Sequence, residues 1–253
     1  MKQRFRDRLL AIFFPERCVF CGAVIPAGDE LCPACREEET RERIAPPTCP
    51  FCGRRAADCT CQRRQRLYDR CVSAYRYHGA VRGGILRLKR KGKPETARFF
   101  AKRLAADIRR EYGGVHFDGI IPVPLSSGAL KARGYNPALW LAQELSAQLS
   151  VPVTEGLVKL YETRPQKELC AGERSGNLLG VFDCREGFSP DRRRFLLVDD
   201  VVTTGSTLEE CAKMLKIYGA AQVLAATAAA TCRESAAQGK RRRESHGGNG
   251  SGT

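Results

Sequence analysis

The sequence predicts an α/β fold with a mostly parallel sheet flanked by helices, preceded by a small cysteine-rich domain. Two observations indicate this: strand and helix patterns alternate from about residue 70 onward, and eight of the thirteen cysteines lie within the first 61 residues. Strands that alternate with helices are usually joined as βαβ units, which give parallel sheets. At 253 residues, the chain is long enough for one well-buried domain and a smaller accessory one.

The N-terminal cysteines form two sets of four, spaced C-x2-C-x10-C-x2-C and C-x2-C-x6-C-x-C. Two thiolates separated by two residues can hold one tetrahedral zinc ion, and Gly22 and Gly53 supply the turns that follow such pairs. A disulfide framework is the alternative, but it requires an oxidising compartment. We therefore expect one or two structural zinc ions, with the cysteine pairs shared in order or crossed over. The expected ligands are Cys18, Cys21, Cys32, Cys35, Cys49, Cys52, Cys59 and Cys61.

The charge balance and the N-terminus narrow the class of protein. Lysines and arginines outnumber acids by 43 to 28, which gives a formal net charge of +15 and favours anionic partners. No apolar run approaches the ~20 residues of a membrane span. Residues 1–18 carry a six-residue apolar core without a small-residue cleavage site, so we interpret them as a short amphipathic helix. We expect a cytoplasmic protein without a membrane span.

The first half of the α/β domain is expected to run strand, helix, helix, strand. Residues 71–77 alternate like a strand, and 79–93 form a helical pattern with Val81, Ile85 and Leu88 on one face. A second helix, at 95–114, ends in glycines, and a short strand at 117–125 ends at a proline.

The second half repeats this alternation. Asn136 is a helix N-cap, and Pro137 occupies the first helical position. After it the sequence predicts a helix to residue 150, a strand at 153–160, a polar loop at 161–180, a strand at 195–201, a helix at 206–219 and a strand at 221–232. Residues 233–253 lack apolar content and are expected to form a disordered basic tail. The expected domains are therefore 1–66, 67–232 and 233–253.

The strongest functional signal is the segment FLLVDDVVTTGST, residues 195–207. Ligands of parallel sheets bind beyond the carboxyl ends of strands, where loops meet helix N-termini. Backbone N–H groups and the hydroxyls of the Val201–Thr207 loop suit a phosphate, and Gly205 permits close approach. Asp199 and Asp200 would repel a phosphate, but acceptor-only carboxylates suit the two hydroxyls of a ribose or a magnesium ion. A ribose 5-phosphate satisfies both halves of the segment.

Two other interpretations of the segment are weaker. The magnesium-binding strand of a P-loop NTPase would need G-x4-G-K-[ST] elsewhere in the chain, and no such stretch occurs in the sequence. A helix cap would explain one aspartate, but it would explain neither the pair of acids nor the run of hydroxyls that follows.

The same segment resembles the phosphoribosyl-pyrophosphate (PRPP) fingerprint of type I phosphoribosyltransferases. The wider chain resembles the ComF family of bacterial competence-associated proteins, because the cysteine pairs are followed in order by DGIIPVPL, KARGYNPA, RPQKELCAGERSGNLLGVF and the fingerprint. The likeness covers about residues 15–232; Pro137, where the family more often has glutamine, is a small departure. It implies a type I phosphoribosyltransferase-like domain behind a double zinc ribbon.

The resemblance also implies roles for individual residues. Asp199 and Asp200 would hold the ribose hydroxyls, and Lys131 and Arg133 would reach the pyrophosphate. The remaining expected ligand contacts are Val201, Val202, Thr203, Thr204, Gly205, Ser206, Thr207, Lys89, Asn136, Gln166, Arg174 and Asn177. Residues 161–180 suit a mobile flap over the site, with a solvated surface loop as the alternative.

The resemblance further implies phosphoribosyl transfer with magnesium and a role in natural transformation. Positioning of the ribose and neutralisation of the leaving pyrophosphate would be the protein's contributions. No stretch of the sequence identifies a pocket for an acceptor, so ligand binding is the firmer expectation.

A non-catalytic adaptor for single-stranded DNA is the competing interpretation. Six basic residues and no acid lie between Arg82 and Lys93, and Tyr68, Tyr75 and Tyr77 precede them and could stack on bases. A solvated helix face and a strand core would explain the same residues equally well, and Lys89 could instead serve the phosphoribosyl site. Competence or DNA-processing proteins are the further partners that this interpretation implies.

Overall fold

A four-stranded parallel sheet forms the centre of the molecule in the computed structural model, which describes residues 15–59, 61, 66–91, 94–160 and 181–232. The strand order is β1–β6–β5–β2, and all three neighbouring pairs are parallel. The strands are β1 (Arg70–Arg76), β2 (Gly119–Pro122), β5 (Arg194–Val202) and β6 (Gln222–Ala230). The prediction of an α/β fold with a mostly parallel sheet is confirmed.

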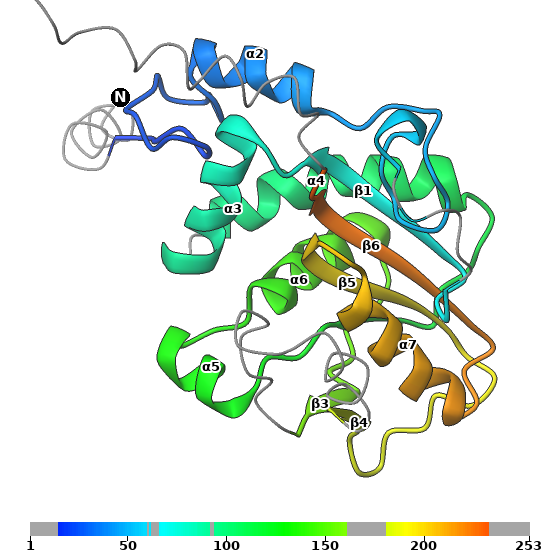
Figure 1. Cartoon of the computed structure of the whole chain (residues 1–253). Helices are drawn as coiled ribbons and strands as arrows, with labels where there is room; N and C mark the ends of the chain where they lie inside the picture. Colours follow the sequence, from blue (N-terminus) through cyan, green and yellow to red (C-terminus); the bar gives the residue numbers. More distant parts are fainter. Residues whose placement is uncertain (1–14, 60, 62–65, 92–93, 161–180, 233–253) are drawn as a thin grey trace, which may run out of the picture.

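Helices cover both faces of this sheet, as Figure 1 shows. On one face α4 contacts β1 and β6, and α6 contacts β2 and β5, while α7 packs against β5 and β6 on the other. The helices of the α/β domain are α3 (Gly79–Lys91), α4 (Pro94–Tyr112), α5 (Ser127–Arg133), α6 (Pro137–Leu149) and α7 (Ser206–Ile217).

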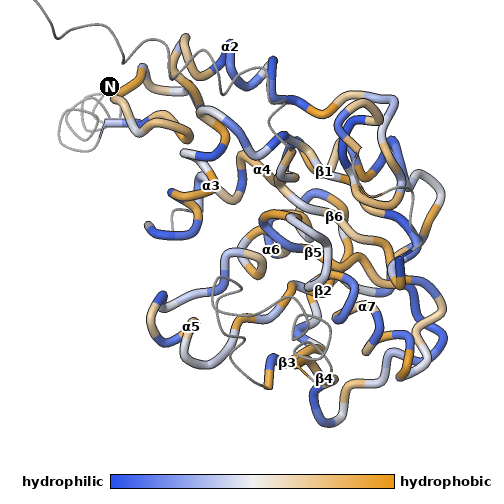
Figure 2. The backbone as a smooth tube through the Cα atoms, viewed as in Figure 1, coloured by the Kyte–Doolittle hydropathy of each residue, from blue (hydrophilic) through white to orange (hydrophobic). Residues whose placement is uncertain are grey.

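The alternation of side chains along β5 divides the interior into two hydrophobic cores. Leu196 and Val198 point into the core on the side of α4 and α6, whereas Phe195 and Leu197 point into the core beneath α7. Side chains of a strand alternate between the two faces of a sheet, so an apolar run of this length serves a strand covered on both sides. In Figure 2 the apolar character of β6 contrasts with the hydrophilic helix α2 (Pro33–Glu42).

Several predicted elements are confirmed in detail, and one is wrong. Val81, Ile85 and Leu88 of α3 are fully buried, and Asn136 caps α6 with its side-chain oxygen. The strand predicted over 153–160 is interrupted. Val153 makes a single parallel bridge to Ile120, and the chain then turns away into β3 (Leu157–Lys159), which pairs antiparallel with β4 (Phe182–Cys184).

A glycine that packs closely against an aromatic ring lies at the interruption of that strand. Gly156 lies so near the ring of Phe188 that a Cβ atom would overlap it. The short elements α5, β4, α2 and the 3₁₀ turn η1 (Ala56–Asp58) were not predicted. The expected N-terminal helix, the 161–180 loop and the tail from residue 233 lie outside the described residues.

The N-terminal region is packed onto the α/β domain at two places. Phe20, in the first cysteine-rich segment, is 1% exposed and contacts the rings of Phe99 and Phe100, with centroid distances of 5.2 and 6.0 Å. Gly84 of α3 makes room for this ring, since a Cβ there would lie 2.6 Å from it. The first segment is therefore anchored on α3 and α4.

The second cysteine-rich segment covers the free edge of β1. Gly53 forms a parallel bridge with Val72, and the N–H of Cys71 donates to Pro50 O at 2.7 Å. Further along the same edge, the N–H of Ile44 donates to Ala74 O at 3.0 Å. An uncovered edge strand would expose unpaired backbone groups, and this segment satisfies several of them.

Candidate functional site

The loop between β5 and α7 places hydroxyl groups at a helix start beyond the carboxyl end of the sheet. Thr203 and Thr204 are exposed, and Gly205 has a φ of 84°, a left-handed conformation in which glycine is favoured. Thr204 Oγ1 and Ser206 Oγ are 2.8 Å apart, and the N–H of Ser206 donates to Thr204 Oγ1 at 3.3 Å. The unpaired N–H groups of a first helical turn attract anions.

The two aspartates lie near the carboxyl end of β5, just before this loop, and on opposite faces of the strand. Asp200 is 7% exposed, whereas Asp199 is half-buried, and the backbone N–H of Asp200 donates to Asp199 Oδ1 at 2.8 Å. Thus the structure brings both acids to the carboxyl end of a central strand, but it gives them different surroundings.

Lys89 of α3 neutralises one of the two acids. Its Nζ lies 2.8 Å from Asp200 Oδ1, and both side chains are largely shielded from solvent. The structure thus places the Lys89 ammonium beside the predicted acid pair. Two carboxylates in adjacent positions would otherwise repel each other strongly.

The other acid holds its proton unusually well. Burial raises the pKa of Asp199 to about 7, and the charge of Asp200 acts in the same direction. The ammonium groups of Lys89 and Lys159 oppose this rise. Lys159, at the end of β3, thus acts electrostatically on Asp199, an influence that the sequence reasoning missed; its place at a strand end before a polar loop was the available signal.

The remaining predicted residues are distributed as follows. Lys131 is exposed and Arg133 is half-buried on α5, which lies with α3 on the side toward which the arrows of β5 and β6 point in Figure 1. In the part of the chain that the structure describes, no ion pair or hydrogen bond joins either side chain to Asp199 or Asp200. Gln166, Arg174 and Asn177 lie outside the described residues.

Asn136 has a structural use that accounts for both ends of its amide. Its Oδ1 accepts from the N–H of Ala138 at 3.0 Å, and its Nδ2 donates to Val123 O at 2.9 Å. It is 8% exposed. The side chain therefore ties the start of α6 to the loop after β2.

Each set of four cysteines is gathered into one cluster, with the pairs shared in order and not crossed. The two clusters are Cys18, Cys21, Cys32 and Cys35, and Cys49, Cys52, Cys59 and Cys61; within each, the sulfurs all lie within 4.8 Å of one another. Four sulfurs at ~2.3 Å from a tetrahedral ion would be about 3.8 Å apart.

Three sulfur–sulfur separations are close to the value for a tetrahedral zinc site. Cys21 and Cys32 are 3.8 Å apart, Cys49 and Cys61 are 3.6 Å apart, and Cys52 and Cys59 are 3.7 Å apart. Both knuckles are closed by backbone bonds, from Gly22 N to Cys18 O and from Gly53 N to Cys49 O. Clusters closed by four sulfurs are typical of structural zinc, with no position left for a substrate.

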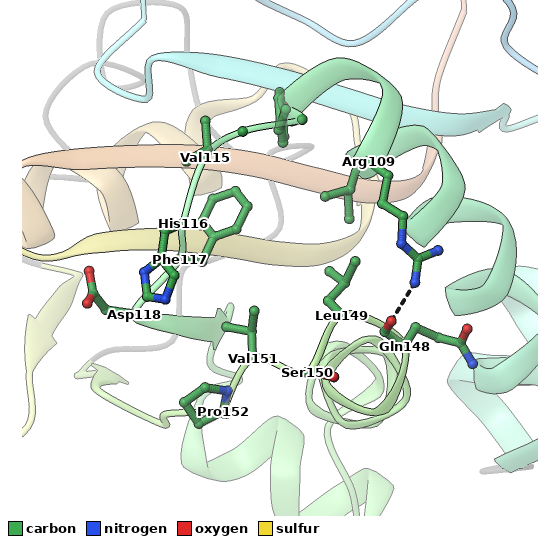
Figure 3. A pocket seen from close by; sticks show the side chains of 14 residues that line it. Arg109, Val115, His116, Phe117, Asp118, Gln148, Leu149, Ser150, Val151 and Pro152 are labelled. Carbon is green, nitrogen blue, oxygen red and sulfur yellow. Dashed lines mark hydrogen bonds between the residues drawn. The ribbon is translucent and has the colours of Figure 1, made fainter.

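A cavity of about 720 Å³ lies at the opposite end of the sheet, where β2 begins, between the ends of α4 and α6 and the segment before β2 (Figure 3). Polar groups around it already serve the fold: Arg109 donates to Gln148 O, and Asp118 Oδ2 accepts from the N–H of Arg194 at 2.8 Å. This cavity is therefore separate from the Asp199–Thr207 site. None of the helices among the described residues is long and apolar enough to cross a membrane.

Comparison with known proteins assigns both parts of the chain. The model of the double zinc ribbon domain matches residues 9–72, and that of the phosphoribosyl transferase domain matches residues 135–246. Among solved structures, adenine phosphoribosyltransferase from Saccharomyces cerevisiae overlaps at a TM-score of 0.36, with 14% identity, over 56% of this chain and 71% of that chain.

Three curated proteins resemble the chain over most of its length. Competence protein F of Haemophilus influenzae is 32% identical over 83% of this chain and 95% of its own. Competence protein ComFC of Bacillus subtilis is 27% identical over 78% and 82%, and DNA utilization protein YhgH of Escherichia coli is 30% identical over 81% and 86%. With a double zinc ribbon domain ahead of a phosphoribosyl transferase domain, this chain belongs to the ComF family of competence proteins.

Proposed function

We propose that this ComF protein binds a phosphoribosyl compound such as PRPP at the carboxyl end of β5. The observation that carries the proposal is the continuous order of groups there: two carboxylates, then the exposed hydroxyls of Thr203 and Thr204, then the N-terminus of α7. Asp199 and Asp200 would accept hydrogen bonds from the ribose hydroxyls, and the loop to Thr207 would receive the 5-phosphate.

The charges around the loop suit the pyrophosphate end of the ligand. Lys89 lies beside Asp200, the charge of Lys159 acts on Asp199, and Lys131 and Arg133 follow the loop after β2. Magnesium prefers carboxylate and phosphate oxygens, so it would enter with the pyrophosphate and supply further positive charge. Departure of pyrophosphate leaves cationic character on the ribose, and positioned cations stabilise that step.

Transfer of the phosphoribosyl group is the reaction that this arrangement supports. In such a reaction, the bond from ribose C1 to pyrophosphate breaks and a bond to an acceptor forms. Release of pyrophosphate from PRPP and magnesium, measured in turn with nucleobases, amines and single-stranded DNA, identifies the acceptor class. Pyrophosphate release with none of them would restrict the function to ligand binding.

Ligand protection of the folded protein tests the binding proposal directly. We expect PRPP with magnesium to raise the melting temperature of the parent. At a ligand concentration a hundredfold above Kd, the free energy of unfolding should increase by about 2.7 kcal/mol. The double variant Asp199→Asn, Asp200→Asn should lose this ligand-induced shift. A matched control removes two exposed acids elsewhere, Glu186→Gln with Asp191→Asn, and should keep it. Equal protection of the aspartate variant and the parent would refute the site.

Handling of single-stranded DNA in the cytoplasm is the second function that we propose. Three relatives are named for competence or DNA utilization, and Arg82 and Arg90 of α3 are exposed. A cytoplasmic location agrees with reduced, zinc-binding cysteines. Stacking of bases on Tyr68 and Tyr75 is excluded, because these rings are 1% and 0% exposed and lie in the core. Tyr77 is half-buried and packs against the same core, so the exposed arginines of α3 are the groups left for a contact, which would be with phosphates.

A further inference from the structure

The loop between β5 and α7, residues 203–205, would receive the phosphate and is called the phosphate loop below. Its orientation depends on the groups that its carbonyls contact. In a trans peptide, the C=O and the N–H of the same unit point in opposite directions. Fixing the carbonyls of Thr203 and Thr204 on one side of the loop therefore directs the N–H groups of Thr204 and Gly205 to the other side. Carbonyls that face the protein interior also need donors, since unpaired buried groups are costly.

Arg54 supplies the first of these donors. Its Nη2 donates to Thr203 O, and its Nε donates to Thr231 O at 2.5 Å, so one guanidinium joins the phosphate loop to the end of β6. Arg54 is only 7% exposed. The rigid fork of N–H donors on a guanidinium can hold two carbonyls in fixed positions, whereas the N–H donors of a lysine ammonium all radiate from one nitrogen on a flexible chain.

The second zinc cluster holds Arg54 in place. Arg54 lies two residues after Cys52, and its own carbonyl accepts from the N–H of Cys49 at 2.8 Å. The neighbouring Gly53 is bridged to Val72 at the edge of the sheet, where a Cβ would lie 2.6 Å from Ser73 Oγ. The guanidinium thus projects from a closed metal knuckle that is itself fixed on β1.

Arg66 supplies the donor for the next carbonyl of the loop. Its Nη2 donates to Thr204 O at 2.9 Å, while its Nη1 forms an ion pair of 2.6 Å with Glu209 on α7. Tyr68 completes this support, because its hydroxyl donates to Phe51 O in the second ribbon and lies 3.0 Å from where a Cβ of Gly205 would be. Two successive peptide units of the loop are held from the zinc-ribbon side.

We propose that Arg54 and Arg66 are positioning residues that aim the N–H groups of Thr204 and Gly205 at the anion, and that the second zinc cluster fixes this aim through Arg54. The consequence for affinity rests on the proposed phosphoribosyl function, but the consequence for the loop itself does not. Loss of the second zinc would loosen the phosphate site of a domain whose sheet remains folded.

The experiment compares Arg54→Lys with Arg55→Lys in the full chain. Arg55 is the adjacent residue of the same ribbon, and its ion pair is with Asp58 at 2.7 Å. Both variants keep the net charge. Hydrogen–deuterium exchange of peptides that cover residues 203–211 is measured without ligand, together with zinc content and the affinity for PRPP with magnesium.

We expect faster exchange of the 203–211 peptides and at least a tenfold loss of affinity for Arg54→Lys, and parental values for Arg55→Lys. Parental exchange and affinity in Arg54→Lys, or equal losses in both variants, would overturn the proposal. Failure of the parent to bind PRPP would refute the proposed ligand instead, and the exchange data would still decide the role of Arg54.

A second pair of variants covers the case in which Arg54→Lys loses zinc or fails to fold. Arg66→Gln removes the donor to Thr204 O from outside the cysteine cluster, whereas Glu209→Gln removes only the ion pair of Arg66. We expect Arg66→Gln to accelerate exchange over 203–211 more than Glu209→Gln does, with zinc content unchanged in both. Equal exchange in the two variants would overturn the role of the Arg66–Thr204 bond.

Discussion

Lys89 Nζ on α3 lies 2.8 Å from Asp200 Oδ1 on β5, and this ion pair joins a basic helix to the acid pair of the proposed ligand site. The position of Lys89 is fixed from a second direction, because the hydroxyl of Tyr135 donates to Leu88 O at 2.7 Å in the same turn of α3. A cation held in this way lowers the repulsion between two adjacent carboxylates. In the proposed complex, a ligand that takes over Asp200 would release this ammonium to pair with its pyrophosphate.

Replacement of Lys89 by methionine should weaken binding of PRPP with magnesium about tenfold to a hundredfold. The reason is the loss of one charge-assisted bond, worth about 1.5 to 3 kcal/mol, in a shielded position. Isothermal titration calorimetry measures the change. Arg90→Met, one residue along the same helix and exposed, is the matched control and should bind as the parent does. Tighter binding by Lys89→Met would mean that Lys89 only competes with the ligand for Asp200.

The raised pKa of Asp199 predicts a pH-dependent stability. Because this pKa is about 7 in the folded chain and near 3.8 when unperturbed, the folded protein keeps a proton that the unfolded chain releases between these values. The resulting stabilisation is complete below about pH 4 and is lost as the pH rises through about 7.

Asp199→Asn removes this titration, so its stability relative to the parent should increase between about pH 5 and about pH 8. We expect a gain of about 1 to 3 kcal/mol at the upper end, measured by thermal unfolding across the pH range. The exposed Asp191→Asn is the control, and its difference from the parent should stay flat. A parent that is most stable near pH 8 relative to Asp199→Asn would contradict the raised pKa.

The fold was predictable from the sequence wherever one local pattern decides the structure. The buried run Phe195–Val198, the apolar face of α3 and the Asn136–Pro137 helix start all follow from spacing and residue type. The strand predicted over 153–160 is only partly present: Val153 and β3 belong to different pairings, and Gly156 between them packs against Phe188, a contact distant in sequence that no local pattern indicates.

The candidate site was predictable only along the strand and loop that carry it. Asp199 to Thr207 are neighbours in sequence, so their proximity follows from the local pattern. The Arg54–Thr203 bond joins residues 149 positions apart, and no local feature of CGRR indicates its partner. The charge of Lys159, on a strand that pairs with β4 outside the main sheet, likewise acts on an acid 40 positions away in the sequence.

The order of cysteine pairing predicts two zinc ions per chain that can be removed separately. Cys61→Ser should lower the zinc content from about two ions to about one, because it opens only the second cluster. Cys71→Ser is the control, since Cys71 is buried outside both clusters and should leave the content at two. Zinc is measured by a colorimetric chelator after unfolding. Full retention by Cys61→Ser would contradict the place of Cys61 in the second cluster.

Binding of single-stranded DNA through α3 should depend on where the positive charge lies and not only on how much there is. Lys89 is occupied by Asp200, and the guanidinium of Arg87 lies against Gly22 of the first ribbon. Arg82 and Arg90 are the exposed arginines of this helix. Removal of both as Arg82→Gln, Arg90→Gln should lower affinity at low salt.

The salt dependence makes this prediction quantitative. Each lost phosphate contact on a single strand reduces the slope of log K against log salt by about 0.7, so the double variant should lose about 1.4. Arg192→Gln with Arg193→Gln removes the same charge from exposed positions before β5, at the other end of the sheet, and should keep the parental slope. Fluorescence anisotropy with a labelled oligonucleotide measures both slopes. If α3 is the contact surface, only the loss of its own arginines should change the slope. An equal decrease of the slope in the two double variants would therefore assign the binding to net charge.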